Sequence, residues 1–325
     1  MSLRTNIFCV SGRLVNSASE SRFKLIDDKL SSTGNFLMFD LSPRWLFSRL
    51  FWSTPKSNRY LFLVEPKTVF PHQYWNFWRM FFEEIVSPIS KHHDWQAGYC
   101  SQEDLLQIGQ FWEQKGRENR VAAIVSNKFS FHKDSRYGDR RTCYSLVARE
   151  FGHMFLGGKN WTRRNSILDL IKNFIFIASS FTVPSMRNDA KSPEKYFREN
   201  EGITICGPQQ STKKFLSNYK IALVIENEKG TYVSEKLCDA ILAGCKIAYM
   251  GGELNQEIIE LYPVYVFHSA DEVCDAIHAL NDMEAPSQEN KSMFEAAQNQ
   301  LGANSVASMV TQTVQIVDRR LGINN

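Results

Sequence analysis

Positive charge lies at two places after residue 118 where a helix is expected to begin. Glu235 and Lys236 lie in the first turn of a helix predicted to start near Val233, and Arg140 and Arg141 open another predicted helix. A cation there opposes the helix dipole at a cost of roughly a few tenths of a kcal/mol. A bound anion would reverse the sign, because free N–H groups and the cation would both attract it. The pattern indicates a diphosphate held between two helix starts; ordinary solvated side chains remain the alternative.

Both helices follow apolar runs, which the chain repeats at regular spacing. We predict strands at 121–125, 203–205, 221–225, 246–250 and 264–267, with helices between most of them. Alternation of this kind predicts a doubly wound parallel sheet. Ligands bind at the carboxyl ends of such strands, so the segments that follow the strands form one expected crevice: Ser126-Asn127, Gly207-Pro208, Glu226-Asn227 and Gly251-Gly252.

The same residues form a longer motif. Residues 219–227 read Tyr-Lys-Ile-Ala-Leu-Val-Ile-Glu-Asn, residues 232–237 read Tyr-Val-Ser-Glu-Lys-Leu, and Val-Ser-Asn at 125–127 precedes Arg140 and Tyr144. This resembles the run Y-K-F-x-L-x-F-E-N, then Y-I/V-S/T-E-K-L/I, of the alpha-1,3/1,4-fucosyltransferases of family 10. The resemblance covers residues 121–156 and 202–300. The chain departs from it at Ile225 and Ile247, where the family has an aromatic residue and a proline, and in a loop one residue shorter before Glu235.

The resemblance implies a fold and a reaction. The fold is α/β of the GT-B type, with two Rossmann-like domains that face each other across a cleft. Residues 1–117 would form the acceptor-side domain, 118–300 the nucleotide-sugar domain with an insertion at about 159–200, and 301–325 a helical tail. The implied reaction is inverting, metal-independent transfer of L-fucose from GDP-fucose to a saccharide hydroxyl, with no cofactor besides the donor.

The resemblance also assigns residues to the donor site. The implied donor-binding residues are Asn127, Arg140, Glu226, Asn227, Tyr232, Glu235 and Lys236. Arg140 and Lys236 would also be catalytic, because their charge neutralises the leaving diphosphate in place of a metal. The carboxylate of Glu235 could accept both hydroxyls of a ribose.

An inverting transfer further needs a base for the acceptor hydroxyl. Glu65 follows the apolar run at 60–64 in Val-Glu-Pro…Pro, which is similar to the family run F-E-S-P-x-x-x-P at the end of an N-domain strand. Burial at that point could raise the pKa of the carboxyl group. The resemblance therefore implies Glu65 as the base, and a plain Pro-rich turn is the alternative. A helix is predicted after it, from about His72 to Val86.

Composition excludes several classes of protein. The chain has 325 residues, is 43% hydrophobic and 22% charged, and has a formal net charge of +3 without a basic stripe, which argues against nucleic-acid binding. The seven cysteines are odd in number and widely spaced without C-x-x-C, which argues for a reducing compartment rather than disulfides or zinc. His92-His93-Asp94 is interpreted as a surface turn and not as a metal site.

The location and partners follow from the same sequence features. The apolar run at 7–10 is too short for a signal peptide and no stretch reaches the length of a membrane span, so we expect a cytoplasmic, bacterial-type protein. Residues 43–52 alternate aromatic and basic side chains, which fits a core helix or an interfacial helix peripheral to the inner membrane. The expected acceptor is a glycan or surface polysaccharide, including a lipid-linked one. A different nucleotide sugar and a non-catalytic nucleotide-sugar-binding protein are the alternatives.

Overall fold

The chain forms two compact units, which are described separately. Unit 1 comprises Met1–Gln102 and Asn304–Asn325, and unit 2 comprises Glu103–Ala303. The division falls before the boundary predicted at residue 117, and it groups most of the predicted tail with unit 1. The computed structural model describes residues 7–9, 23–25, 35–41, 46–69, 71–87, 98–128, 130, 132, 134–161, 202–230 and 233–320. The predicted turn at 92–94 and residues 162–200 of the predicted insertion lie outside the described residues.

Unit 2 is built on a six-stranded sheet in the order β11-β10-β9-β6-β7-β8. Every pair of neighbouring strands is parallel, which confirms the predicted parallel sheet. The strands are β6 (Glu118–Ile124), β7 (Met154–Gly157), β8 (Ile203–Gly207), β9 (Tyr219–Ile225), β10 (Lys246–Met250) and β11 (Val264–Val266). The chain runs outward from β6 to β8, returns to β9 beside β6, and then runs outward the other way. The strand order therefore reverses between β6 and β9, which is the point where doubly wound sheets bind ligands.

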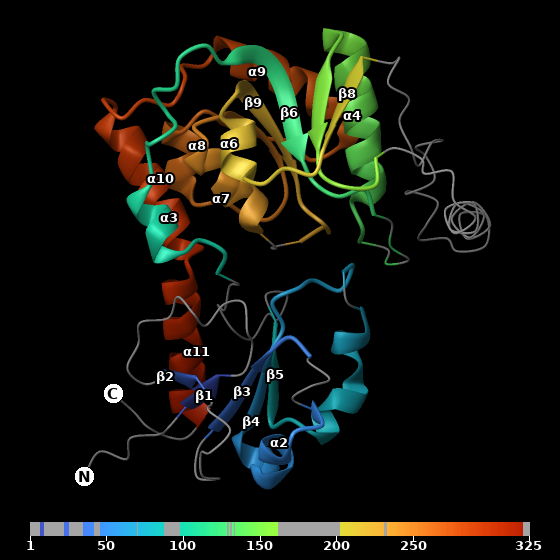
Figure 1. The fold of residues 1–325 in the computed structure, drawn as a ribbon, viewed down its shortest axis with the longest axis vertical. Helices are drawn as coiled ribbons and strands as arrows, with labels where there is room; N and C mark the ends of the chain where they lie inside the picture. The colour runs from blue at the N-terminus through green and yellow to red at the C-terminus, as the bar shows by residue number, and fades with distance from the viewer. Residues whose placement is uncertain are drawn as a thin grey trace, which may run out of the picture. The chain divides into compact units, whose positions relative to one another are not determined.

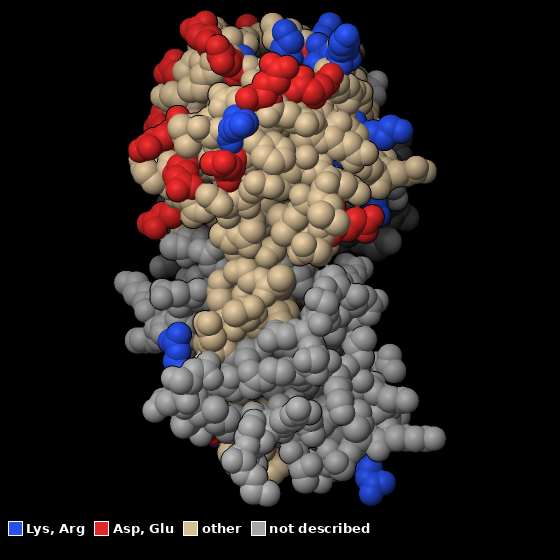
Figure 2. All heavy atoms as spheres, turned by 90° about the vertical axis from the view of Figure 1, so that its left-hand side faces the viewer, with Lys and Arg blue, Asp and Glu red and all other residues tan. Residues whose placement is uncertain are grey.

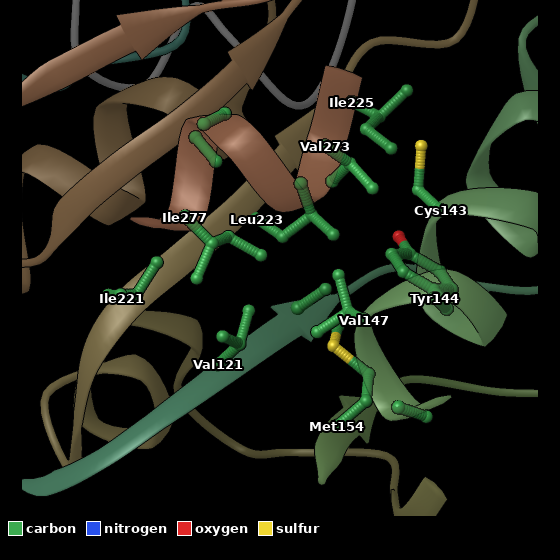
Figure 3. Packing of buried hydrophobic residues seen from close by; sticks show 14 of the residues in the cluster. Val121, Cys143, Tyr144, Val147, Met154, Ile221, Leu223, Ile225, Val273 and Ile277 are labelled. Carbon is green, nitrogen blue, oxygen red and sulfur yellow. The ribbon is translucent and has the colours of Figure 1, made fainter. Parts of the chain in front are cut away.

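Helices pack on the sheet of unit 2 because its strands are apolar on both faces (Figure 1). The helices of unit 2 are α4 (Tyr137–Phe151), α6 (Thr212–Leu216), α7 (Glu235–Leu242), α8 (Gln256–Leu261), η7 (Ala270–Glu272), α9 (Val273–Asp282) and α10 (Lys291–Ala303), and α3 (Gln102–Leu106) begins at the division between the units. Figure 3 shows the core between α4, α9 and the strands, where Tyr144 and Val147 meet Leu223 and Ile277. This packing fixes the start of α4 and the end of β9 with respect to each other.

Unit 1 has a five-stranded parallel sheet in the order β2-β1-β3-β4-β5. Its elements are β1 (Ile7–Cys9), β2 (Phe23–Leu25), β3 (Asn35–Phe39), α2 (Arg49–Ser53), η2 (Lys56–Asn58), β4 (Arg59–Phe62), η3 (Pro71–Tyr74), η4 (Asn76–Met80), β5 (Glu84–Val86) and α11 (Val306–Arg320). Successive residues of β3 point to opposite faces of the sheet. Leu37 lies in one cluster with Val317 of α11, and Phe36 lies in another with Phe51 and Phe82.

The helix predicted from His72 to Val86 is not continuous. Two short 3-10 helices and strand β5 occupy this segment, and Trp75 between them is extended, with φ −70° and ψ 135°. Aromatic side chains lose rotamer freedom in a helix, so this aromatic-rich run has a weak helix propensity. Pairing of β5 with β4 and burial of Phe82 therefore determine the structure of this segment instead.

The described residues include no membrane-spanning helix, and one face of unit 2 carries no basic stripe. Among the described residues, no helix combines the length and the apolar character needed to cross a bilayer. On the face drawn in Figure 2, acidic and basic side chains of unit 2 lie among each other. That face offers no continuous cationic track for a nucleic-acid backbone.

Candidate functional site

The carboxyl end of β9 carries a buried carboxylate that is bonded to the start of α7. Glu226 has an exposed fraction of 0%, and its backbone N–H donates to the carbonyl of Met250 over 2.9 Å. Its Oε1 accepts the backbone N–H of Ser234 over 2.8 Å, and its Oε2 lies 3.5 Å from Nζ of Lys236. A buried carboxylate is stable only when it is paired and hydrogen-bonded. Glu226 therefore fixes the first turn of α7 to the strand end.

Lys236 is held by oxygen atoms on several sides. Ser234 is the N-cap of α7, and its Oγ accepts both the backbone N–H of Lys236 over 3.3 Å and its Nζ over 2.7 Å. A carboxylate oxygen of Glu235 lies 3.5 Å from the same Nζ, and 11% of the Lys236 side chain is exposed. The two carboxylates offset the unfavourable position of the lysine at the positive end of the helix dipole.

Arg140 reaches the same strand end from α4. It is 2% exposed, and its Nε donates to the carbonyl of Ile225 over 2.9 Å. Its Nη2 donates to Oδ1 of Asn227 over 2.9 Å. The structure thus brings Arg140 and Lys236 to three consecutive residues, Ile225 to Asn227, at the reversal point of the sheet.

Two further residues near the predicted site form hydrogen bonds to other segments. Asn127 follows β6 and is 5% exposed; its backbone N–H and Nδ2 donate to the carbonyls of Lys159 and Asn160 over 2.9 and 3.1 Å. It therefore fixes the segment after β7. Arg141 has an exposed fraction of 0%, and its Nη1 donates to the carbonyl of Lys128. Tyr232 lies outside the described residues.

Glu235 is the accessible carboxylate of the group. Its side chain is 53% exposed, in contrast with the 0% of Glu226. Surrounding protein acts to raise the pKa of Glu235, but Lys236, a backbone hydrogen bond and the charge of Arg140 together hold the pKa below its ordinary value. The carboxylate is therefore ionised at neutral pH and can accept hydrogen bonds from hydroxyl groups.

Sequence reasoning missed Arg136, which lies beside these residues. It is 8% exposed, its backbone N–H donates to the carbonyl of Asn227 over 3.0 Å, and its Nη1 lies 3.9 Å from Asp139. Burial is the largest influence on the Arg136 pKa and lowers it. Because α4 starts at Tyr137 and not at Arg140, a correct helix start would have placed Arg136 at the N-cap. It adds a third cation at the end of β9.

A second group of polar residues lies at the carboxyl ends of β3 and β4 in unit 1. Glu65 is half-buried; its N–H donates to Oδ1 of Asp40 over 3.2 Å, and its carbonyl accepts the hydroxyl of Tyr74 over 2.9 Å. Asp40 Oδ1 also accepts the N–H of Val64 over 2.9 Å. Burial raises the Asp40 pKa against these two hydrogen bonds. Asp40 has φ +55°, which is uncommon for a residue with a side chain and marks a specially held position.

Asp40 was also not identified as a site residue from the sequence, although its position there could have indicated it. It directly follows the apolar run 35–39, as Glu65 follows 60–64. No group of three or more His, Cys, Asp or Glu residues within the described ranges is arranged to hold a metal ion.

Comparisons with known proteins identify the fold. No protein-family model matches the chain, and no curated protein does. A UDP-forming α,α-trehalose-phosphate synthase from Burkholderia xenovorans, solved with glucose-6-phosphate, is 10% identical, with a TM-score of 0.50 over 89% of this chain and 73% of that chain. A second structure of such an enzyme from Burkholderia xenovorans is 7% identical, with a TM-score of 0.50 over 90% of this chain and 75% of that chain. At this identity the likeness concerns the fold alone, and with two parallel-sheet α/β units it shows that the chain has the GT-B fold of these glycosyltransferases.

Proposed function

We propose that this protein is a nucleotide-sugar-dependent glycosyltransferase and that its donor is GDP-fucose. The observation that carries the proposal is the meeting of Arg140 and Lys236 at Ile225 to Asn227, where the sheet order reverses. Cations and a strand end combine there, beside the first turn of α7, as a diphosphate site requires. The motif at 219–237 supports GDP-fucose in particular.

Each residue of the group has a proposed role. Nζ of Lys236 turns from its carboxylate partners to the diphosphate when the donor binds, and the accessible Glu235 accepts the ribose hydroxyls. Arg140 and the newly found Arg136 supply positive potential from within the protein, where charge acts more strongly than in water. Glu226, predicted to contact the donor, is assigned a supporting role because none of its surface is exposed. Asn127, Asn227 and Tyr232 complete the proposed donor site.

The proposed reaction is an inverting displacement without a metal. Glu65 takes the proton of an acceptor hydroxyl, the hydroxyl oxygen forms a bond to the anomeric carbon, and the bond to the diphosphate breaks to release GDP. The hydrogen bonds from Val64 and Glu65 to Asp40 hold the backbone that carries this base. The proposed acceptor is a glycan or surface polysaccharide, including a lipid-linked one, in a bacterial cytoplasm.

A different donor is the second candidate. The solved structures of the same fold include UDP-forming enzymes, which supports a UDP-sugar as the alternative. A protein that binds a nucleotide sugar without transferring it would use the same group of residues. The nucleotide preference and the turnover are therefore measured separately.

Calorimetric titration with GDP, UDP, CDP and dTDP tests the donor site. We expect GDP to bind most tightly and Lys236→Ala to weaken it by roughly tenfold to a hundredfold, because a charge-assisted contact contributes about 1.5–3 kcal/mol. Lys220→Ala, at an exposed position of β9, is the matched control and leaves GDP affinity unchanged. Tighter binding of UDP contradicts the fucosyl assignment, and equal effects of the two lysine variants contradict the site.

A further inference from the structure

Exposed aromatic and large apolar side chains are concentrated in one stretch of unit 1. Among the described residues, eight large hydrophobic side chains are exposed, and five of them lie between residues 47 and 80. They are Phe47 (84%), Trp52 (57%), Trp75 (62%), Phe77 (50%) and Met80 (61%). Scattered exposed residues need no explanation, but a group of this kind marks an interaction surface.

Four of these residues, Phe47, Trp52, Phe77 and Met80, lie on two segments that meet, and we call them the aromatic surface. The rings of Trp52 and Phe81 are 5.9 Å apart, and the rings of Phe81 and Phe77 are 5.1 Å apart. Residues 46–53 and 76–81 are thus neighbours in space. Phe47 and Met80 are exposed on the same two segments.

A buried arginine joins the two segments. Arg59 is 8% exposed, and its guanidinium donates to the carbonyls of Thr54, Trp52 and Phe81 over 2.7, 3.4 and 3.5 Å. It also lies 4.4 Å from the ring centre of Phe51, which is buried in the core. The exposed side chains therefore stand on a backbone that is already fixed, so little ordering is needed before they can bind.

The aromatic surface lies at the amino end of β4, whereas Glu65 lies beyond its carboxyl end. Arg59 begins β4 and contacts both segments of the surface, and Glu65 comes six residues later. At about 3.3 Å per residue of extended chain, the backbone between the two positions can span up to roughly 20 Å. The proposed base and the aromatic surface thus lie at opposite ends of β4.

The charge around the aromatic surface has one predominant sign. Arg49, Lys56 and Arg79 are exposed on the same segments or on the turn between them. Glu83, next to Arg59, is the exposed carboxylate within residues 46–69 and 71–87. The excess of cations favours an anionic partner.

We propose that the aromatic surface rests on an anionic lipid bilayer. Trp and Phe side chains enter the boundary between headgroups and acyl chains, while Arg49, Lys56 and Arg79 meet lipid phosphates. Cations near such a membrane are attracted by its negative surface potential, and the apolar side chains add their burial. The surface predicted at 43–52 is thereby extended by a second segment, 76–81, while residues 43–45 lie outside the described residues. The proposal does not depend on the transferase assignment.

Vesicle sedimentation with the full chain tests the proposal. We expect binding to vesicles of phosphatidylcholine mixed with phosphatidylglycerol, weaker binding to phosphatidylcholine alone, and loss of binding as salt is raised. The double variant Trp52→Ser/Phe77→Ser should bind the mixed vesicles at least roughly tenfold more weakly, since the loss of two anchors exceeds 1.4 kcal/mol. Leu106→Ser removes a side chain that is 81% exposed in unit 2, and should change nothing.

A second variant separates charge from hydrophobic contact. Arg49→Glu/Arg79→Glu should abolish the preference for phosphatidylglycerol, and circular dichroism should show that both double variants remain folded. Absence of vesicle binding, or equal losses for Leu106→Ser and the aromatic double variant, would overturn the proposal. It is also overturned if the aromatic double variant dissociates a dimer in sedimentation analysis while vesicle binding is unchanged, because the surface would then bind a second copy of the chain.

Discussion

Glu226 and Glu65 look alike in the sequence and differ in the fold. Each follows an apolar strand, but Glu226 is completely buried and bonded to Ser234 and Lys236, whereas Glu65 is half-buried, with its backbone held by Asp40 and Tyr74. The first carboxylate connects two elements, and the second has accessible surface at a strand end. A carboxylate after a buried strand can therefore connect two elements or face a substrate, and the exposed fraction of its side chain distinguishes the two roles.

The largest expected effect concerns the accessible carboxylate. Glu65→Gln keeps the size of the side chain but removes its basicity, so we expect turnover of GDP-fucose to fall about 10²–10⁴-fold. Donor affinity and the free energy of unfolding should stay unchanged. Glu83→Gln, an exposed position at the other end of the unit 1 sheet, serves as the control. If Glu65→Gln turns over GDP-fucose at the wild-type rate, Glu65 is not the base. Asp40 would then be the next candidate.

The buried carboxylate should instead affect stability first. Glu226→Ala leaves Lys236 and the N–H of Ser234 without their buried partner, so we expect the free energy of unfolding to fall by about 3 kcal/mol. Urea denaturation measures the change, and Glu253→Ala at an exposed position provides the comparison. If Glu226→Ala is as stable as the wild type but binds GDP more weakly, Glu226 contacts the donor directly, as predicted from the sequence.

The sequence predicts some strands of unit 2 and not others. The apolar runs at 121–125, 221–225 and 246–250 predict β6, β9 and β10 because buried parallel strands are apolar on both faces. The four residues of β7 are too few to form a pattern, and they gain their partners only through pairing with β6 and β8.

Some features of the candidate site are likewise predicted by the sequence, and others are not. The spacing of Arg140 and Lys236 after two strands predicts that both approach one edge of the sheet, because strand ends meet there. The burial of Glu226 depends on Gly251, which is distant in the sequence. A Cβ on Gly251 would lie 2.2 Å from the hydroxyl oxygen of Tyr249 and 2.6 Å from Cγ of Glu226, so the absence of a side chain there makes room for both side chains. Such a fit between two loops is not encoded in either loop alone.

The smallest expected effect concerns Asp239 on α7, which lies near the accessible Glu235. Burial and then the charge of Glu235 raise the Asp239 pKa from 3.8 to about 7, although Lys213 acts in the opposite direction. The folded protein therefore holds a proton that the unfolded chain releases between pH 3.8 and about pH 7. Stability should fall as the pH rises through this interval and level off above it.

Asp239→Asn removes this dependence. We expect the variant to melt about 2 °C higher than the wild type at pH 8 and to show a smaller difference at pH 4. Thermal denaturation of both proteins at the two pH values measures the change, and the difference between them cancels the titration of other groups. An equal difference at both pH values would mean that the pKa of Asp239 is not raised in the folded protein.

Helix α11 imposes an order of events on the newly made chain. Met309, Val310 and Val317 cover the face of the unit 1 sheet that contains Leu37, Tyr60 and Phe62, although all of unit 2 lies between them in the sequence. During synthesis the ribosome releases β3 and β4 long before this helix, so that face stays uncovered until α11 emerges. Unit 2, by contrast, is one continuous segment and has its whole core available earlier. Unit 1 can therefore mature only after unit 2 has been synthesised, even though its strands come first.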